Sequence, residues 1–315
     1  MRLVLVHGVG AHQRPDAERA DWVSALATGA AAAGHERFAT LLRGGSIRTA
    51  FVRYADLYQR PDKQGHRTDL DAAQAAIVHA MMQEIIVHQR ELGEDDESRR
   101  ILRHAMHQLA PSGAPQGLLA PVRHLIGVAT TLLSLPVIRP AGHRLTGALM
   151  IADLVQVARY LARNDVDEAG TPLDVRIRRR LRAALDDGPA VVVAHSLGSI
   201  VALEALHEWT GPVPLFVTLG SPIGLRGAVW QHIPEACRST PPRVGRWLNY
   251  WDRDDLVAAR PVVETFVRPN TSGVAPRSTR VDSAGIWVHT ATKYLQQPKV
   301  AAPIAEAFTP VLGQQ

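Results

Sequence analysis

Several residue types that mark particular classes of protein are scarce in this sequence. The chain of 315 residues contains a single cysteine, Cys237, so no internal disulfide can form. Such sparse cysteine usage is typical of a reducing compartment. Aromatic residues make up only 5% of the chain, too few to indicate platforms that stack nucleic-acid bases. We therefore expect a cytoplasmic protein for which nucleic acid is not a partner.

We expect neither a signal peptide nor a membrane-spanning helix. The sequence opens with MRLVLVHG, a short strand before a turn, without the apolar core and cleavage site of a signal peptide. The most apolar tract, residues 118–138, is interrupted by Arg123, His124 and Pro136. Its uninterrupted part has about fourteen residues, fewer than the roughly 20 that a membrane-spanning helix needs. We expect this tract to form the core of a helical cap or the wall of a site for a lipid-like acyl group, with peripheral membrane contact as the alternative.

The charge of the chain is positive but mixed. With 46% hydrophobic and 21% charged residues the composition is that of a globular protein. The formal net charge is +5, yet 30 acidic residues are interspersed with 35 basic ones. The densest basic run is RIRRRLR at 176–182, on a predicted helix whose inward stripe is Val175, Ile177, Leu181 and Leu185. We interpret this run as a solvated helix face.

Residues 188–206, GPAVVVAHSLGSIVALEAL, carry the strongest functional signal. The apolar run 190–194 is rich in valine and too short for a helix, as expected of a strand buried on both faces. From Ser199 onward the apolar residues recur at helical spacing. Ser196 therefore lies in a tight turn between a buried strand and a helix.

Such a turn suits a nucleophilic serine. It exposes the hydroxyl above the sheet, and the helix that begins there directs backbone N–H groups toward developing negative charge. Ala194 and Gly198, two residues on either side of Ser196, are small, as the close approach of the chain requires; His195 completes the turn. A serine that merely caps the helix is the alternative.

A second turn follows the first strand, residues 2–6. It reads His7-Gly8-Val9-Gly10. Glycine here lets the backbone approach a reacting carbonyl, so that the N–H of Val9, together with that of Leu197, forms an oxyanion hole. A dinucleotide-binding loop is disfavoured because GVGAHQ lacks the third glycine of GxGxxG.

A triad also needs a carboxylate and a histidine. The stretch WLNYWDRDDLVA offers Asp252, Asp254 and Asp255 at a strand tip, and it resembles a bacterial hydrolase pattern in which the second aspartate of Asp-x-x-Asp is the triad acid. That resemblance selects Asp255, with Asp254 as the alternative and Asp252 as a turn cap. His289 is the only one of 14 histidines that follows Asp255, which matches the order Ser, Asp, His.

These motifs together resemble the α/β-hydrolase superfamily, and within it bacterial lipase-like and serine-peptidase-like hydrolases. Ala194 replaces the first glycine of the usual GxSxG. The resemblance implies an α/β-hydrolase fold with a mostly parallel central sheet of about six strands flanked by helices. Further strands are predicted at 47–54, 213–219, 244–251 and 278–283. Residues 1–58 and 166–315 would form the core, and residues 59–165 a large helical cap insertion.

The expected activity is that of a serine hydrolase, a carboxylesterase or lipase-like enzyme that acts on a small-molecule or lipid-like acyl substrate through an acyl-enzyme. A peptidase or amidase, an acyltransferase, and a non-catalytic binding protein on the same fold are the alternatives. No cofactor is expected. His104 and His107 have helical spacing, but no carboxylate at metalloprotease spacing accompanies them, so we do not expect a metal site.

Overall fold

The computed structural model describes residues 1–9, 15–58, 70–92, 95–110, 120–136, 147–185, 188–283 and 289–312. Six strands form one sheet in which all neighbours are parallel, in the order β2-β1-β3-β4-β5-β6. The strands are β1 (Arg2–Val6), β2 (Thr49–Val52), β3 (Ala190–His195), β4 (Leu215–Leu219), β5 (Trp247–Asp252) and β6 (Pro276–Val281). The six predicted strands are confirmed, with ends that differ by a few residues.

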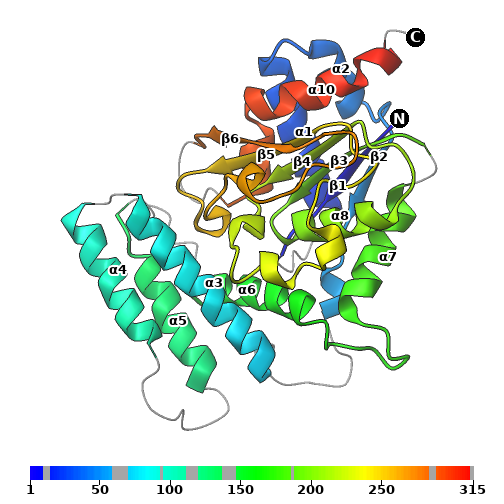
Figure 1. The fold of residues 1–315 in the computed structure, drawn as a ribbon. Helices are drawn as coiled ribbons and strands as arrows, with labels where there is room; N and C mark the ends of the chain where they lie inside the picture. The colour runs from blue at the N-terminus through cyan, green and yellow to red at the C-terminus, as the bar shows by residue number, and fades with distance from the viewer. Residues whose placement is uncertain are drawn as a thin grey trace.

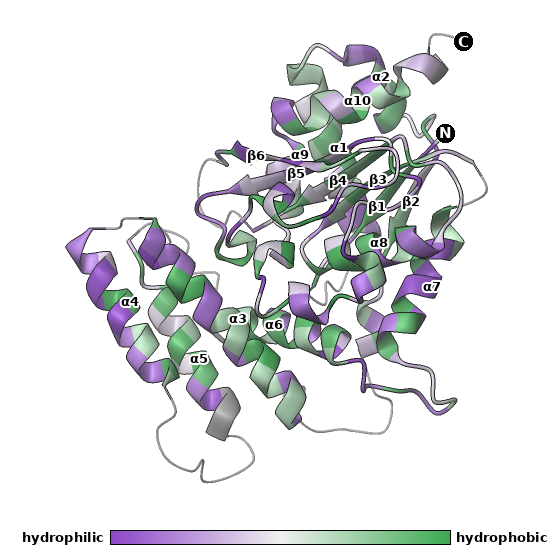
Figure 2. Cartoon of the chain, viewed as in Figure 1, coloured by the Kyte–Doolittle hydropathy of each residue, from purple (hydrophilic) through white to green (hydrophobic). Residues whose placement is uncertain are grey.

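Both faces of the sheet are buried, which explains why its central strands are almost entirely apolar. Successive side chains of a strand point to opposite faces. Val4 and Val192 therefore belong to one hydrophobic core, and Leu3 and Val191 belong to a second core on the other face. The central strands are mainly green, that is hydrophobic, in Figure 2.

Helices cover each face of the sheet (Figure 1). One layer consists of α1 (Pro15–Ala32), α2 (Glu36–Arg43), α9 (Ala291–Leu295) and α10 (Pro298–Leu312), and it packs on the second core. The opposite layer contains α7 (Leu173–Leu185) and α8 (Leu197–Glu208). The described chain is thus an α/β protein with a helix–sheet–helix sandwich.

The predicted insertion is helical where it is described. It contains α3 (Ala72–Glu91), α4 (Asp96–Leu109), α5 (Ala120–Leu132) and α6 (Gly147–Ala162), which pack on one another. Figure 1 shows α4 and α5 farthest from the sheet and α6 closest to it. The Asp71 side chain caps α3 by accepting a hydrogen bond from the Gln74 N–H, and Asp95 caps α4 in the same way through Ser98.

The apolar tract provides core for these helices. Leu125, Val128 and Leu132 on α5 are buried in the same hydrophobic cluster as Ile85 on α3 and Leu154 on α6. This cluster continues into the sheet face that α8 covers. In the described part of the chain, no helix has both the length and the hydropathy that crossing a membrane requires.

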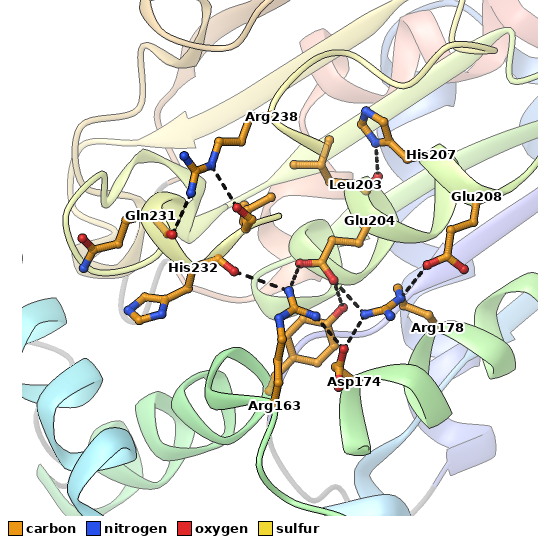
Figure 3. A network of polar contacts seen from close by, with 12 residues as sticks. Arg163, Asp174, Arg178, Leu203, Glu204, His207, Glu208, Gln231, His232 and Arg238 are labelled. Atoms are coloured by element: carbon orange, nitrogen blue, oxygen red, sulfur yellow. Dashed lines mark hydrogen bonds and ion pairs between the residues drawn. The ribbon is translucent and has the colours of Figure 1, made fainter. Parts of the chain in front are cut away.

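The arginine-rich helix α7 differs from its predicted solvated face. Arg179 is exposed, but the Arg178 side chain is only 13% exposed and lies within hydrogen-bonding distance of three carboxylates, on Asp174, Glu204 and Glu208 (Figure 3). Glu204 of α8 is itself almost fully buried. A buried carboxylate is stable only when it is paired, so these acids hold the Arg178 side chain in a buried position. The predicted solvated face is therefore wrong at Arg178.

The same carboxylates hold a second arginine. Arg163, which follows α6, lies 2.5 Å from Asp174 and 2.6 Å from Glu204, and the Tyr160 hydroxyl donates to Glu204 at 2.9 Å. The network therefore joins the last helix of the insertion to α7 and α8 (Figure 3). It fixes α6 against the sheet layer, which bears on the site described next.

Candidate active site

Ser196 occupies a strained turn between β3 and α8. Its backbone angles are φ 53° and ψ −130°, a conformation that costs a non-glycine residue free energy and is concentrated at functional sites. The strain is held by the Ser196 N–H, which donates to the Leu219 carbonyl of β4 at 3.0 Å. The serine is therefore fixed at the carboxyl edge of the sheet, at the first turn of a helix.

Small residues allow the turn at Ser196 and the turn after β1 to approach each other closely. A Cβ atom on Gly198 would collide with the carbonyl oxygen of His7, and one on Gly8 would lie 2.6 Å from the Cβ of Ser196. Both approaches are closer than real Cβ contacts, so the two turns come as near to each other as glycine permits. The requirement for small residues, expected from the motif, has this direct geometric cause.

The structure brings Ser196, His289 and Asp255 together. The Nε2 atom of His289 is 3.0 Å from the Ser196 hydroxyl oxygen, and its Nδ1 is 2.8 Å from the Asp255 carboxylate. The carboxylate accepts the Nδ1–H, which leaves Nε2 free to accept the serine proton. All three side chains are buried, and they come from the loops after β3, β5 and β6.

The three aspartates at the tip of β5 have different partners. Asp255 accepts from the backbone N–H of Val257 at 3.0 Å and faces His289. Asp252 instead accepts from the backbone N–H groups of Asp254 and Ser283, at 3.0 and 2.5 Å, as the expected turn cap would. Asp254 is partly exposed and makes no hydrogen bond to His289. The geometry thus places Asp255, and not the alternative Asp254, against the imidazole.

Tyr294 is a partner of Asp255 that the sequence motifs did not indicate. Its hydroxyl, fully buried on α9, donates to the Asp255 carboxylate at 2.7 Å and accepts from the Asp252 N–H at 3.1 Å. Nothing in the sequence distinguished this tyrosine except its position on the helix that follows His289. It gives the carboxylate a second side-chain donor.

Gly220, just after β4, makes the contact between acid and base possible. It has φ +53°, and a Cβ atom there would lie 2.7 Å from the Asp255 carboxylate and 3.2 Å from Nδ1 of His289. Any larger residue would push the two side chains apart. The glycine of the Gly220-Ser221-Pro222 turn therefore shapes the site without contributing a functional group.

The charges of this pair stabilise each other. Burial alone would lower the pKa of His289, but the neighbouring Asp255 carboxylate, its hydrogen bond and the more distant Asp153 raise that pKa above its ordinary value. Burial likewise opposes ionisation of Asp255, yet the charge of His289 and the hydrogen bonds from His289, Tyr294 and the Val257 N–H lower the pKa of the carboxyl. The geometry favours an ionised acid beside a histidine that readily takes a proton.

The expected oxyanion turn lies beside Ser196. Leu197 opens α8, so its N–H is free of intrahelical bonds, and Val9 follows the glycine that touches the serine. The turn is anchored by the Tyr54 hydroxyl, which donates to the His7 carbonyl at 2.6 Å, and by the His7 imidazole, which lies 2.5 Å from Glu18. Gly10 lies outside the described residues.

The ring of His195 packs against the ring of His289. Its ring centroid is 4.7 Å from that of His289, with 39° between the planes. Burial, and next the charges of His289 and His7, lower the pKa of His195 well below its ordinary value. A neutral imidazole at this position packs against His289 without competing for the Asp255 carboxylate.

Asp153 is the second residue near the site that the motifs missed. It lies on α6, and its electrostatic partners are His289 and His7. Burial, which outweighs both histidines, raises the pKa of this carboxyl to about 6. The only sequence signal is an isolated aspartate within the apolar run GALMIADLV.

The described residues contain no group of three or more His, Cys, Asp or Glu that could hold a metal ion. His104 and His107 are exposed on the outer helix α4. The fold defines an α/β protein with an all-parallel sheet and helices on both faces. Comparison of the chain with protein-family models, with curated proteins and with solved structures gives no match.

Proposed function

We propose that the chain is a serine hydrolase of the α/β-hydrolase type, which cleaves a carboxylic ester through an acyl-enzyme intermediate. One observation supports this above all others: the 3.0 Å contact of the Ser196 hydroxyl with Nε2 of His289, whose Nδ1 lies 2.8 Å from Asp255. A serine with a base in hydrogen-bonding reach, and a third group that orients the base, is the arrangement that activates a nucleophile.

The proposed reaction begins with proton transfer. His289 takes the proton of Ser196 as the serine oxygen forms a bond to the substrate carbonyl carbon, and the carbonyl becomes an oxyanion. The tetrahedral species then loses its alcohol, which leaves with the proton from His289. Water, deprotonated by the same histidine, attacks the acyl-serine and releases the acid and the free enzyme.

Backbone donors and Asp255 stabilise the charges that develop. The N–H groups of Val9 and Leu197 would bind the oxyanion; one such donor contributes about 3 kcal/mol in a serine hydrolase. Asp255 stabilises the imidazolium, and the lowered pKa of its carboxyl keeps it ionised while His289 cycles. Tyr294 and the Val257 N–H prevent the carboxylate from rotating away.

An ester is the favoured substrate because its alcohol needs less protonation to leave than an amine does. The helices next to the site are also apolar: Met150 and Leu154 flank Asp153 on α6 and belong to the main hydrophobic core. Apolar helices of this kind suit an acyl chain better than a peptide backbone, which would require hydrogen-bonding partners.

Covalent labelling with a fluorophosphonate tests the proposal, together with the hydrolysis of 4-nitrophenyl esters of short and long acyl chains. We expect wild type to be labelled at Ser196 and Ser196→Ala to lose labelling and about 10⁴-fold or more in kcat. Ser272→Ala, in an exposed loop, is the matched control and should retain both. Labelling that persists in Ser196→Ala, or active wild type that resists the probe, would contradict the mechanism. Faster turnover of peptides than of esters would instead select an amidase.

A further inference from the structure

One acidic side chain of the helical insertion is coupled electrostatically to His289 and His7, which border Ser196. Asp153 lies on α6, between Met150 and Leu154, both of which are buried in the main hydrophobic core. The aspartate itself is only partly exposed. A carboxylate in such a setting is unfavourable unless it is paired or serves a function.

A chain of contacts fixes how α6 lies over the site. The Tyr58 hydroxyl donates to the Gln156 carbonyl of α6 at 3.0 Å, and the Arg159 guanidinium donates to the Tyr58 carbonyl at 3.0 Å. The ring of Tyr58 lies 6.4 Å from that of Tyr54, whose hydroxyl holds the His7 carbonyl. Helix α6 is therefore tied to the same turn that borders the serine.

Asp153 lies one helical turn before Gln156, on the same side of α6. Its carboxylate interacts electrostatically with both His7 and His289. His289 contacts the Ser196 hydroxyl, and Gly8, next to His7, contacts the Ser196 Cβ position. This coupling and the contacts that tie α6 to the His7 turn together place Asp153 on the part of the insertion that borders Ser196.

Neither histidine neutralises Asp153. His7 is engaged with Glu18 at 2.5 Å, and His289 with Asp255 at 2.8 Å. No hydrogen bond or ion pair to Asp153 occurs within the described part of the chain, and its electrostatic partners there include no arginine or lysine. Burial raises the pKa of the carboxyl to about 6, so it is mostly ionised at neutral pH. The site thus contains a negative charge for which the described residues offer no ion-pair partner.

We propose that Asp153 determines the specificity of the proposed hydrolase by binding a positively charged group of the substrate, an ammonium near the scissile carbonyl. A substrate cation would supply the partner that the carboxylate lacks, and in a partly dry site such a charge-assisted contact is stronger than in water. The inference rests on the proposed function and assigns a substrate class to it: cationic esters or thioesters.

Two matched pairs of substrates test this assignment for a charge on either side of the scissile bond. Butyrylthiocholine and 3,3-dimethylbutyl thiobutyrate differ by a cation on the leaving group. The 4-nitrophenyl esters of 4-trimethylammoniobutyrate and 5,5-dimethylhexanoate differ by a cation on the acyl group. In wild type we expect kcat/KM to favour the cationic member of at least one pair by about tenfold or more, because the trimethylammonium group, which has no N–H to donate, is attracted to the carboxylate by its charge.

Asp153→Asn should bring that ratio close to one, because the amide keeps the size of the side chain but loses its charge. Asp153→Glu should restore part of the preference. Asp96→Asn removes a carboxylate from the outer helix α4, where the Asp96 side chain is 91% exposed, and should keep the wild-type ratio. Circular dichroism and thermal unfolding of each variant establish that it is folded.

A wild-type ratio near or below one in both pairs, or a preference that persists in Asp153→Asn, would overturn the assignment. A change in the pH profile of Asp153→Asn without a change in the ratio would also overturn it, because it would indicate that the carboxylate acts only on His289. These results are distinguishable from failure of the proposed function, in which Ser196 is not labelled and the neutral esters are not hydrolysed in a Ser196-dependent way.

Discussion

The loops at the carboxyl ends of the strands and the helical insertion contribute to the site by different means. The strand-end loops hold reacting atoms through backbone constraints: a strained Ser196, a left-handed Gly220 and N–H groups that fix Asp255. The insertion presents Asp153 from an ordinary helix, and ion pairs such as Arg163 with Glu204 hold that helix in place. In the proposed enzyme the chemistry would therefore depend on the strand-end loops, and the choice of substrate on the insertion.

This difference predicts different sensitivities. Positions in the strand-end loops should tolerate few substitutions, because a displacement of about 1 Å between reacting groups can lower the rate about 10²-fold. A helix that contributes only charge tolerates more, since electrostatic interactions decline gradually with distance. Four substitutions test this comparison, three of them with a matched control variant.

The largest effect is expected from the aspartates of the β5 tip. Asp255→Asn should lower kcat by about 10⁴-fold, because an amide no longer holds His289 in the tautomer that accepts the serine proton. Asp254→Asn, one residue earlier, should lower kcat little, as Asp254 is partly exposed and does not contact His289. Steady-state kinetics on a 4-nitrophenyl ester measure both. Equal losses would show that the geometry has been assigned to the wrong carboxylate.

Gly220→Ala should lower kcat by about 10²-fold. The new methyl group would meet the Asp255 carboxylate at 2.7 Å and Nδ1 of His289 at 3.2 Å, so the acid and the base must separate. Gly273→Ala is the control, because it has a similar φ of +75° but nothing within 4 Å of the added atom. If both variants lose the same activity, backbone strain and not the site contact is responsible.

The ion pairs that hold the insertion should affect stability. Glu204→Gln leaves Arg163 and Arg178 with less compensation in a buried network, and we expect a loss of about 3 kcal/mol in the free energy of unfolding. Glu208→Gln, whose carboxylate is 38% exposed, should cost less than about 1 kcal/mol. Urea unfolding gives both values. A stability of Glu204→Gln equal to that of wild type would mean that the network does not fix α6.

The smallest effect concerns the pH dependence of kcat/KM. His289 must be neutral to accept the serine proton, and its pKa is raised above the ordinary 6.5, so activity should rise with pH through a midpoint above that value and then level off. Asp153 is one of the charges that raise this pKa. Asp153→Asn should therefore move the midpoint to lower pH. A midpoint that stays where it is in wild type would place the two side chains farther apart than the structure does.

The sequence was most informative where one local pattern determines the structure. Apolar runs such as AVVVA in β3 can be buried on both faces of a sheet and in few other ways, so the central strands were the most predictable, whereas β6, which reads PRSTRV, has no such run. The turn around Ser196 was predictable for a related reason, since Ala194 and Gly198 leave space that only a tight turn uses. The solvated face assigned to α7 was wrong because a helix reveals its own spacing but not the carboxylates, such as Glu204, that a distant segment brings to it.

Tyr294 and Asp153 were missed for the same physical reason. Each acts through a partner far away in sequence: the tyrosine through Asp255 and the aspartate through His289 and His7. A tyrosine on a short helix, or a single acidic residue in an apolar helix, is compatible with many structural roles until its tertiary contacts are known. The distinction between Asp254 and Asp255 rested on a resemblance alone, and the side-chain contacts now give it a geometric basis.

The pairing of β1 with β3 has a consequence for how the molecule is made. Arg2 lies opposite Ala190 in the sheet, so β1, which has β2 on its other side, gains this second neighbour only after α3, α4, α5 and α6 have been synthesised. Contacts between such distant segments form slowly, and His289 emerges later still. We expect β1 and β2, whose open edge persists until β3 has been synthesised, to be the part of the nascent chain that most needs a chaperone.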